Sequence, residues 1–273
     1  MICGAGHSGS TLLGLLLDSH SCCFYIGEGA KVRFLGDERK ALRKRACKIC
    51  GEDCPVWSDF SWDRSQPLYS AIMGRVDRPV VIDSSKDPEW LRGRIAELDR
   101  AGIHGVLLLL LRDGRAVINS RLRKYPDRDA ATQIRDWMQQ IERSRELYRD
   151  FGGSRLTVRY EALATRPDLE MQRVCTAAGL DFEPAMLRFE EFEHHPLGGN
   201  TGTQYLASRD AGVAGPAANI GLRSREYYEQ HPRGIQLDLR WQREMSAEHL
   251  ALFDEAAGGF NEPMAWEAGD WPE

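Results

Sequence analysis

The chain has 273 residues, a mass of 30.9 kDa and a formal net charge of -5 at pH 7. An acidic chain has no overall attraction for nucleic acid or anionic membranes, so a polyanion-binding role is disfavoured. No linker rich in Ser, Gly or Pro and no long run of charge divides the sequence, which predicts a single domain over residues 1–273.

The apolar segments and the cysteines bear on the cellular location of the protein. The early Leu-rich run is interrupted by Gly14 and is too short to span a bilayer, and no signal-like segment precedes it. Seven unevenly spaced cysteines fit a reducing compartment better than a disulfide framework. The sequence therefore predicts a cytoplasmic protein without a membrane span.

A glycine-rich turn opens the chain and is followed by a run, residues 12–17, that suits a buried helix. A strand, turn and helix in this order bind phosphate, because loop amides and helix N-terminal donors point at one spot. Only Met1 and Ile2 precede the turn, so either the start of the chain is truncated or the first strand is completed differently.

Two phosphate-binding templates fit this turn, and a plain tight turn without a ligand is a third interpretation. Gly4, Gly6 and Gly9 match the dinucleotide fingerprint GxGxxG, with Glu28 at about the distance of a ribose-binding acid. The same segment matches the P-loop GxxxxGK[ST], except that Ser10 replaces the lysine. Loss of that lysine argues against ordinary hydrolysis of ATP or GTP.

The next segment is expected to deliver Glu28 to the turn and then to leave the sheet. Residues 22–26 form a short apolar run, a loop or a strand, that leads to Gly27-Glu28-Gly29. The basic residues 31–45 are expected to be helical, within an irregular insertion at about 29–75 that contains cysteines. This insertion is either part of an acceptor pocket or a solvated surface loop.

Three of the cysteines, Cys47, Cys50 and Cys54, have spacings typical of a metal knuckle. A structural zinc site needs a fourth ligand, and the local sequence offers none. Cys22, Cys23 or a histidine would supply it only through the fold. Zinc binding and a reduced, metal-free loop both remain open, and His194-His195 are interpreted as loop residues.

Two buried-type strands then end in polar residues. Residues 78–83 form a strand closed by Ser84-Ser85-Lys86, and Asp87 caps a helix that runs to about residue 100. Residues 105–111 form a second strand, followed by Arg112 and a helix carrying Ser120. Because open α/β sheets bind ligands at the carboxyl ends of their strands, Lys86 and Arg112 are candidate anion-binding residues. For the second helix, a solvated basic face is the alternative.

The remaining pattern completes the fold prediction. A long helix over 128–150, a strand over 155–160 and a helix over 169–178 continue the alternation of strands and helices. The prediction is an α/β, P-loop-like three-layer sandwich with a central parallel sheet flanked by helices. Residues 190–235 are expected to form a flexible flap over the site, and the final helix is expected to begin near Ala247.

With these segments assembled, the chain resembles the sulfotransferases that use 3′-phosphoadenosine 5′-phosphosulfate (PAPS), closest to the bacterial and tyrosylprotein branches. Four stretches carry the resemblance, in the family's order: residues 4–13, 83–88, 112–120 and 159–163. The physical reading agrees, because PAPS has two separate anionic ends and the sequence offers two anion sites at strand ends.

The resemblance implies a role for each matched residue. The product would be PAP, and the reaction would be in-line transfer of a sulfuryl group to a hydroxyl or amine, with no metal required. Glu28 would be the general base, Lys86 would contact the sulfuryl or bridging oxygens, and burial would have to raise the pKa of Glu28. The residues implied to bind PAPS are Gly6, His7, Ser8, Gly9, Ser10, Thr11, Arg112, Ser120 and Tyr160.

The chain departs from the family's pattern at two places. His7 stands where lysine or arginine is usual; it is expected to donate to the sulfonate but carries a charge only when protonated, so activity should fall at high pH more than in relatives. No clear match exists for the family's glycine-and-lysine segment, for which Arg233-Gly234 is a stand-in. The competing interpretations are a P-loop-type small-molecule kinase and a nucleotide-binding protein without sulfotransfer activity. The acceptor and the oligomeric state stay open, and no nucleic-acid partner is expected.

Overall fold

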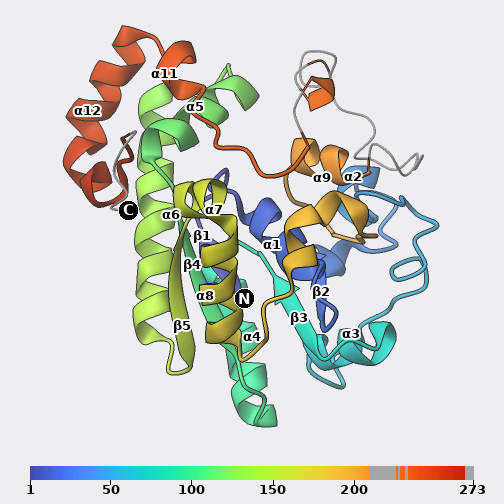
Figure 1. The fold of residues 1–273 in the computed structure, drawn as a ribbon. Helices are drawn as coiled ribbons and strands as arrows, with labels where there is room; N and C mark the ends of the chain where they lie inside the picture. The colour runs from blue at the N-terminus through green and yellow to red at the C-terminus, as the bar shows by residue number, and fades with distance from the viewer. Residues whose placement is uncertain (209–225, 227, 231–232, 268–273) are drawn as a thin grey trace.

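The computed structural model describes residues 1–208, 226, 228–230 and 233–267 (Figure 1). Within these residues the strands pair in parallel as two groups, β1–β4–β5 and β2–β3. The strands are β1 (Ile2–Gly4), β2 (Cys23–Gly27), β3 (Val80–Asp83), β4 (Val106–Leu111) and β5 (Ser154–Arg159). The parallel pairing predicted from the alternation of strands and helices is confirmed.

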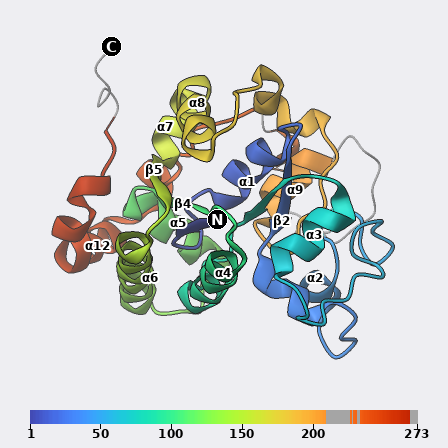
Figure 2. The same cartoon turned by 90° about the horizontal axis from the view of Figure 1, so that it is seen from below.

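Helices cover both faces of these strands. The longer helices are α1 (Ser10–Asp18), α3 (Leu68–Val76), α4 (Pro88–Ala101), α5 (Gly114–Lys124), α6 (Ala130–Asp150), α8 (Pro167–Ala178), α9 (Thr201–Ser208) and α12 (Ala247–Asn261). The shorter ones are η1 (Gly29–Phe34), α2 (Leu42–Arg45), α7 (Tyr160–Thr165), η2 (Pro184–Glu191), α11 (Trp241–Glu244) and η4 (Glu262–Met264). Seen from below, α1, α7 and α8 lie on one side of the strands, and α4 and α6 lie on the other (Figure 2). The three-layer sandwich is confirmed.

Strand β4 explains why the layers form around it. Its sequence, Val-Leu-Leu-Leu-Leu-Leu, has no polar position, which suits a parallel strand covered on both faces. Leu107 and Leu109 pack into the hydrophobic cluster on one side, whereas Leu108 and Leu110 pack into the cluster on the other. Alternate side chains of one strand therefore join the two halves of the core.

The predicted helix boundaries are largely confirmed. The Asp87 carboxylate accepts a hydrogen bond from the Trp90 amide at the start of α4, and Gly102 ends the helix with a φ of 64°. Helix α12 begins at Ala247, as expected. None of the described helices is both long and apolar enough to cross a membrane.

The basic segment 31–45 was wrongly predicted to be helical throughout. It consists of the 3-10 helix η1, a turn at Gly36 with a φ of 71°, and the single turn α2. Its cations are mostly exposed, so little packing supports a longer helix. The insertion at 29–75 is not wholly irregular either, because it contains α3. Much of the predicted flap at 190–235 lies outside the described residues, and the described part includes α9.

Candidate active site

The glycine-rich turn after β1 is shaped for close backbone approach. Gly4, His7 and Gly9 all have positive φ angles, of 137°, 73° and 95°. A Cβ at Gly9 would lie 2.6 Å from Cδ2 of Tyr160, so only glycine fits there. Helix α1 begins directly after Gly9 and has no side-chain cap, so its N-terminal donors face the turn without a capping oxygen.

This turn lines a cavity of about 280 Å³, whose other walls come from the carboxyl ends of strands, from α5 and α9, and from the C-terminal segment around Asp238. All but one of the predicted site residues line it: Gly6, His7, Gly9, Ser10, Thr11, Glu28, Lys86, Arg112, Ser120 and Tyr160. Ser8 does not, because it is 1% exposed, and its Oγ has no partner among the described residues. The Gly6 amide is also engaged, since it donates to Oε1 of Gln140 at 3.1 Å.

Lys86 connects the start of α1 to the candidate base. Its ammonium donates to Oγ of Ser10 at 3.2 Å and to the Ser84 carbonyl at 2.9 Å, and it lies 3.3 Å from Oε1 of Glu28. Ser10 occupies the P-loop lysine position in the sequence. A lysine from the end of β3 thus reaches the place from which the loop's own lysine is missing.

The pKa of Glu28 moves opposite to the expectation from burial. Burial raises this pKa, but the ammonium groups of Lys86 and Lys31 and a backbone hydrogen bond from Gly199 together outweigh it, so the pKa lies below its usual range. The expected raised pKa was therefore wrong for the free protein. Glu28 is ionised near neutral pH and is one-quarter exposed, so it is able to accept a proton.

Residues 197–200 complete the wall of the cavity beside Glu28, and this was not predicted from the sequence. The Glu28 amide donates to the Leu197 carbonyl at 2.5 Å, and Leu197 donates back to Ile26 at 2.8 Å. The Asn200 amide donates to Oγ1 of Thr11 at 2.9 Å. The paired glycines Gly198 and Gly199, which both have positive φ angles, were the available sequence signal for a backbone that approaches another segment closely.

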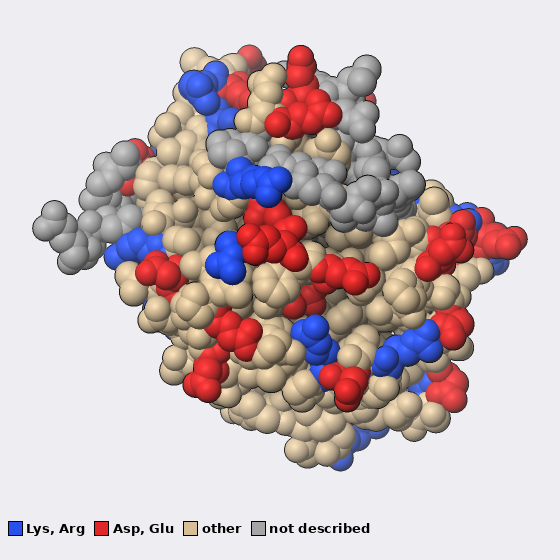
Figure 3. All heavy atoms as spheres, turned by 45° about the vertical axis from the view of Figure 1, so that its right-hand side comes forward, with Lys and Arg blue, Asp and Glu red and all other residues tan. Residues whose placement is uncertain are grey.

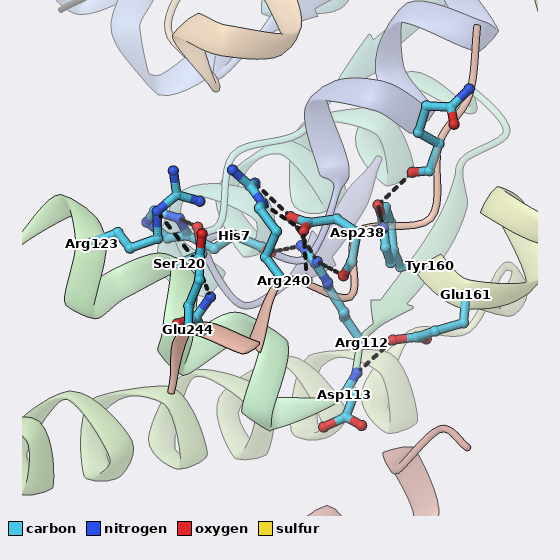
Figure 4. Close-up of polar contacts among 12 residues, drawn as sticks. His7, Arg112, Asp113, Ser120, Arg123, Tyr160, Glu161, Asp238, Arg240 and Glu244 are labelled. Carbon is cyan, nitrogen blue, oxygen red and sulfur yellow. Dashed lines mark hydrogen bonds and ion pairs between the residues drawn. The ribbon is translucent and has the colours of Figure 1, made fainter. Parts of the chain in front are cut away.

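Arg112 forms the centre of the other end of the cavity (Figure 4). Its guanidinium lies 4.1 Å from the centre of the Tyr160 ring and donates to the carbonyls of His7 and Asp238. The Asp238 carboxylate lies between two guanidinium groups, 3.3 Å from Arg112 and 2.7 Å from Arg240. Burial raises the pKa of Asp238, yet the two arginines and a backbone hydrogen bond hold it well below its usual range.

The sequence interpretation missed Asp238 and Arg240. It proposed Arg233-Gly234 as the C-terminal contribution, but Gly234 and Arg240 line the cavity, whereas Arg233 does not. The sequence around Asp238 and Arg240 matches no motif, so nothing in it marks these two residues as part of the site. They are recognised only because the fold brings the C-terminal segment next to Arg112.

His7 and Ser120 form a pair beside this arginine. Nδ1 of His7 lies 2.8 Å from Oγ of Ser120, and the imidazole packs edge-on against Tyr125. Burial, assisted by the charges of Lys124, Arg121, Arg112 and Lys86, lowers the pKa of His7 to about 3. His7 is therefore neutral at ordinary pH. The assumption behind the expected loss of activity at high pH, that His7 carries a charge near neutral pH, is therefore wrong for the free protein.

Tyr160 and Glu161, which follow β5, tie the end of this strand to two other segments. The Tyr160 hydroxyl donates to the Gln236 carbonyl at 2.9 Å and accepts from the Asp238 amide at 3.1 Å. Oε1 of Glu161 accepts from the Asp113 amide at 2.9 Å, and burial raises the pKa of Glu161. These contacts fix both the start of α5 and the C-terminal segment (Figure 4).

One outer face of the molecule has mixed charge. Basic and acidic side chains are interspersed on the face drawn in Figure 3, where it is not covered by residues outside the described set. Cations gather instead around one cavity, which is lined by the largely buried Lys86, Arg112 and Arg240 and by the exposed Lys124. The site is therefore suited to a small anion rather than to a polyanion.

The protein is an α/β sandwich whose cavity has a glycine-rich loop at one end and the buried Arg112 at the other. The model of the Sulfotransferase family matches residues 1–184, and the chain belongs to that family. The chain is 26% identical over 207 residues to protein-tyrosine sulfotransferase 2 of Gallus gallus, covering 71% of this chain and 54% of that protein. It thus spans about half the length of this curated relative.

Two solved structures share the fold. The sulfotransferase domain of the Synechococcus PCC 7002 olefin synthase is 17% identical, with a TM-score of 0.55 and coverage of 98% of this chain and 94% of that one. The sulfotransferase domain from the curacin biosynthetic pathway is 18% identical, with a TM-score of 0.52 and coverage of 94% and 96%. At these identities the likeness establishes the architecture alone.

Proposed function

We propose that this protein transfers the sulfuryl group of PAPS to a hydroxyl or amine of an acceptor molecule. The observation that carries the proposal is the position of Lys86, within 3.3 Å of both Ser10 at the start of α1 and the carboxylate of Glu28. One cation thereby links a phosphate-type loop to a candidate base. Membership of the family supports the same reaction type.

The residues present fit a donor with two anionic ends. At one end, the turn and α1 offer backbone donors, the hydroxyls of Ser10 and Thr11, and Lys86. At the other end, Ser120 and Lys124 accompany Arg112, whose buried Nε has no partner among the described residues. An unpartnered guanidinium nitrogen in a buried site is costly and favours an anion beside it.

PAPS, when bound, would supply a sulfuryl group already activated by its link to a phosphate. Lys86 and the N-terminal amides of α1 would stabilise the negative charge that develops on the leaving phosphate oxygen. Glu28 would accept the acceptor's proton as the new bond to sulfur forms and the bond from sulfur to the phosphate oxygen breaks.

The ion pair between Lys86 and Glu28 would make the basicity of Glu28 depend on whether the donor is bound. In the free protein, Lys86 holds the pKa of Glu28 low, which makes the carboxylate a weak base. A sulfonate beside Lys86 would share the ammonium's charge and would thereby raise the basicity of Glu28. The base would then be strengthened when the donor is in place. The acceptor itself is left as a hydroxyl- or amine-bearing molecule, and a cytoplasmic location remains a prediction.

The alternative of a P-loop-type kinase is less well supported. A kinase would use the loop's own lysine and a bound metal at the triphosphate, and it would have no use for a second anion site around Arg112. Calorimetry with PAP, ATP and NAD separates these ligands. We expect PAP to bind with micromolar or better affinity and to lose about tenfold to a hundredfold in Arg112→Ala. A preference for ATP, or PAP binding unchanged by Arg112→Ala, would reject the proposal.

A further inference from the structure

We propose that Cys47, Cys50, Cys54 and His195 bind a structural zinc ion. The sequence offered three cysteines and no local fourth ligand. The fold brings His195, more than 140 residues later, beside them, and one ligand atom from each residue lies within 4.8 Å of all the others. The site is separate from the cavity, because none of these four residues lines it.

The distances fit tetrahedral coordination. Nδ1 of His195 lies 3.2 Å from Sγ of Cys50 and 3.5 Å from Sγ of Cys54. A tetrahedral zinc ion with its usual bond lengths to sulfur and nitrogen separates such ligand atoms by about 3.5 Å. The imidazole nitrogen therefore already lies at the ligand-to-ligand distance from two of the thiols.

The backbone around the cysteines has the form of a metal-binding turn. Cys47 and Gly51 form an antiparallel bridge, and Gly51 has a φ of 85°, which closes the turn directly after Cys50. The Cys50 amide donates to Sγ of Cys47 at 3.5 Å. Amide donors to sulfur stabilise metal-bound thiolates and orient them.

The histidine is held by its surroundings in the orientation that a ligand requires. Its Nε2, on the far side of the ring, lies 3.4 Å from Oε1 of Glu193, which favours Nδ1 as the ligand atom. Its carbonyl accepts from Nε1 of Trp57 at 2.6 Å. A histidine ligand that is supported by a carboxylate is the usual arrangement at zinc.

The ligand set and its burial select both the metal and its role. Cys47 and Cys54 are fully buried, and the His195 side chain is only 12% exposed. Three thiols and one imidazole favour zinc over magnesium or calcium, and four protein ligands leave no open position for a substrate. A disulfide would join only two of the three thiols and would not account for the third thiol or for the imidazole beside them.

The metal would fasten the cysteine-containing insertion to the wall of the cavity. Leu197, two residues after His195, forms bridges with both Cys47 and Gly27, and it accepts from the Glu28 amide. The Lys48 amide donates to the Pro196 carbonyl at 2.9 Å. Zinc would therefore stabilise the segment that positions Glu28, whatever reaction the cavity performs.

Metal analysis of the wild-type protein is the first test. Protein produced in zinc-supplemented medium and purified without chelators should contain about one zinc ion per chain by plasma mass spectrometry. Replacement by Co²⁺ should give the visible absorption of tetrahedral thiolate coordination. A wild-type protein that holds less than about a tenth of an equivalent, and that added Zn²⁺ does not stabilise against unfolding, would overturn the proposal.

Variants then identify the ligands. Cys50→Ser and His195→Ala should each lose at least about tenfold in zinc affinity and should unfold at a lower temperature. Cys22→Ser and His104→Ala are the matched controls, because neither residue belongs to the cluster, and both should retain zinc. Equimolar zinc with an unchanged cobalt spectrum in His195→Ala would reject the assignment. If a ligand variant fails to fold, zinc release from the wild-type protein on titration of its thiols supplies the same test.

Discussion

The two ends of the cavity hold their cations in different ways. At the loop end, Lys86 comes from the end of β3 and divides its contacts between Ser10 and Glu28. At the arginine end, Arg112 is held by the carbonyl and carboxylate of Asp238, 126 residues further along the chain. The first end thus places a cation beside a potential base, and the second places a cation in a preformed ion pair.

This difference suggests that one end of the cavity governs turnover and the other governs the affinity for PAP. The Lys86 side chain is 17% exposed, and its ammonium has a partner that an incoming anion can replace, so it is suited to charge that changes during a reaction. Arg112 is 7% exposed and fixed from several sides, so it is suited to charge that stays constant. Changes at the loop end should therefore lower kcat, whereas changes at the arginine end should alter the binding of PAP.

The largest effect is expected from Glu28→Gln, which removes the candidate base but keeps the shape of the side chain. Turnover should fall by about 100-fold to 10,000-fold, because general base catalysis contributes that much. PAP affinity, measured by calorimetry, should change by less than about threefold, because the substitution leaves Ser10, Lys86 and Arg112, the residues proposed to hold PAP, in place. Glu38→Gln, an exposed change in the insertion, is the control. Near-normal turnover in Glu28→Gln would show that another group takes the proton.

Lys86→Met should reduce turnover by about 100-fold, a loss comparable to that of removing one preorganised donor from a transition state. It should also move the acidic limb of the kcat/KM profile to higher pH, because burial raises the pKa of Glu28 and Lys86 opposes it. The pH profile distinguishes this linkage from a general loss of structure. A lower rate with an unmoved acidic limb would mean that Lys86 does not control the base.

At the arginine end, Asp238→Asn should separate affinity from stability. The change leaves two guanidinium groups near each other without their shared carboxylate, which should destabilise the free protein by about 2 kcal/mol. PAP should bind about threefold to tenfold more tightly, because its phosphate no longer competes with Asp238 for Arg112. Thermal unfolding and calorimetry measure the two effects, with the exposed Asp99→Asn as the control. Weaker PAP binding would show that Asp238 positions Arg112 rather than competing for it.

Much of the fold, and the site residues that directly follow the strands, could be predicted from local sequence. Strand β4 is predictable because its run of aliphatic residues has no amphipathic alternative, and α4 is predictable because Asp87, Pro88 and Gly102 mark its ends. The turn and the residues that follow β3 and β4 were predictable because parallel strands bring their carboxyl ends to one edge. Local rules therefore located Lys86 and Arg112.

The parts that were missed depend on contacts between distant segments. His195 becomes a candidate ligand only because Leu197 pairs with Gly27 and Cys47, and Asp238 reaches Arg112 only through the path of the C-terminal segment. The pKa values of Glu28 and His7 were mispredicted for a related reason. Their direction is set by cations that other strands and helices bring near them, and such neighbours are invisible in a single sequence.

The smallest effect, and the sharpest test of the arginine end, concerns His7. Its pKa of about 3 in the folded protein lies below the value of 6.5 of an unperturbed histidine, so its stability contribution is fully present above pH 6.5 and declines as the pH falls toward 3. Between pH 6.5 and 5 the loss is about 2 kcal/mol, at about 1.4 kcal/mol per unit. Relative to His7→Gln, which does not titrate, the wild-type protein should therefore lose about that much unfolding free energy, whereas the exposed His104→Gln should follow the wild type.

Because His7 is neutral above pH 7, the ratio of kcat/KM between wild type and His7→Gln should stay constant from pH 7 to 9. A ratio that falls over this range would mean that His7 acts as a cation, and that the bound donor, rather than the cations of the free protein, sets its charge.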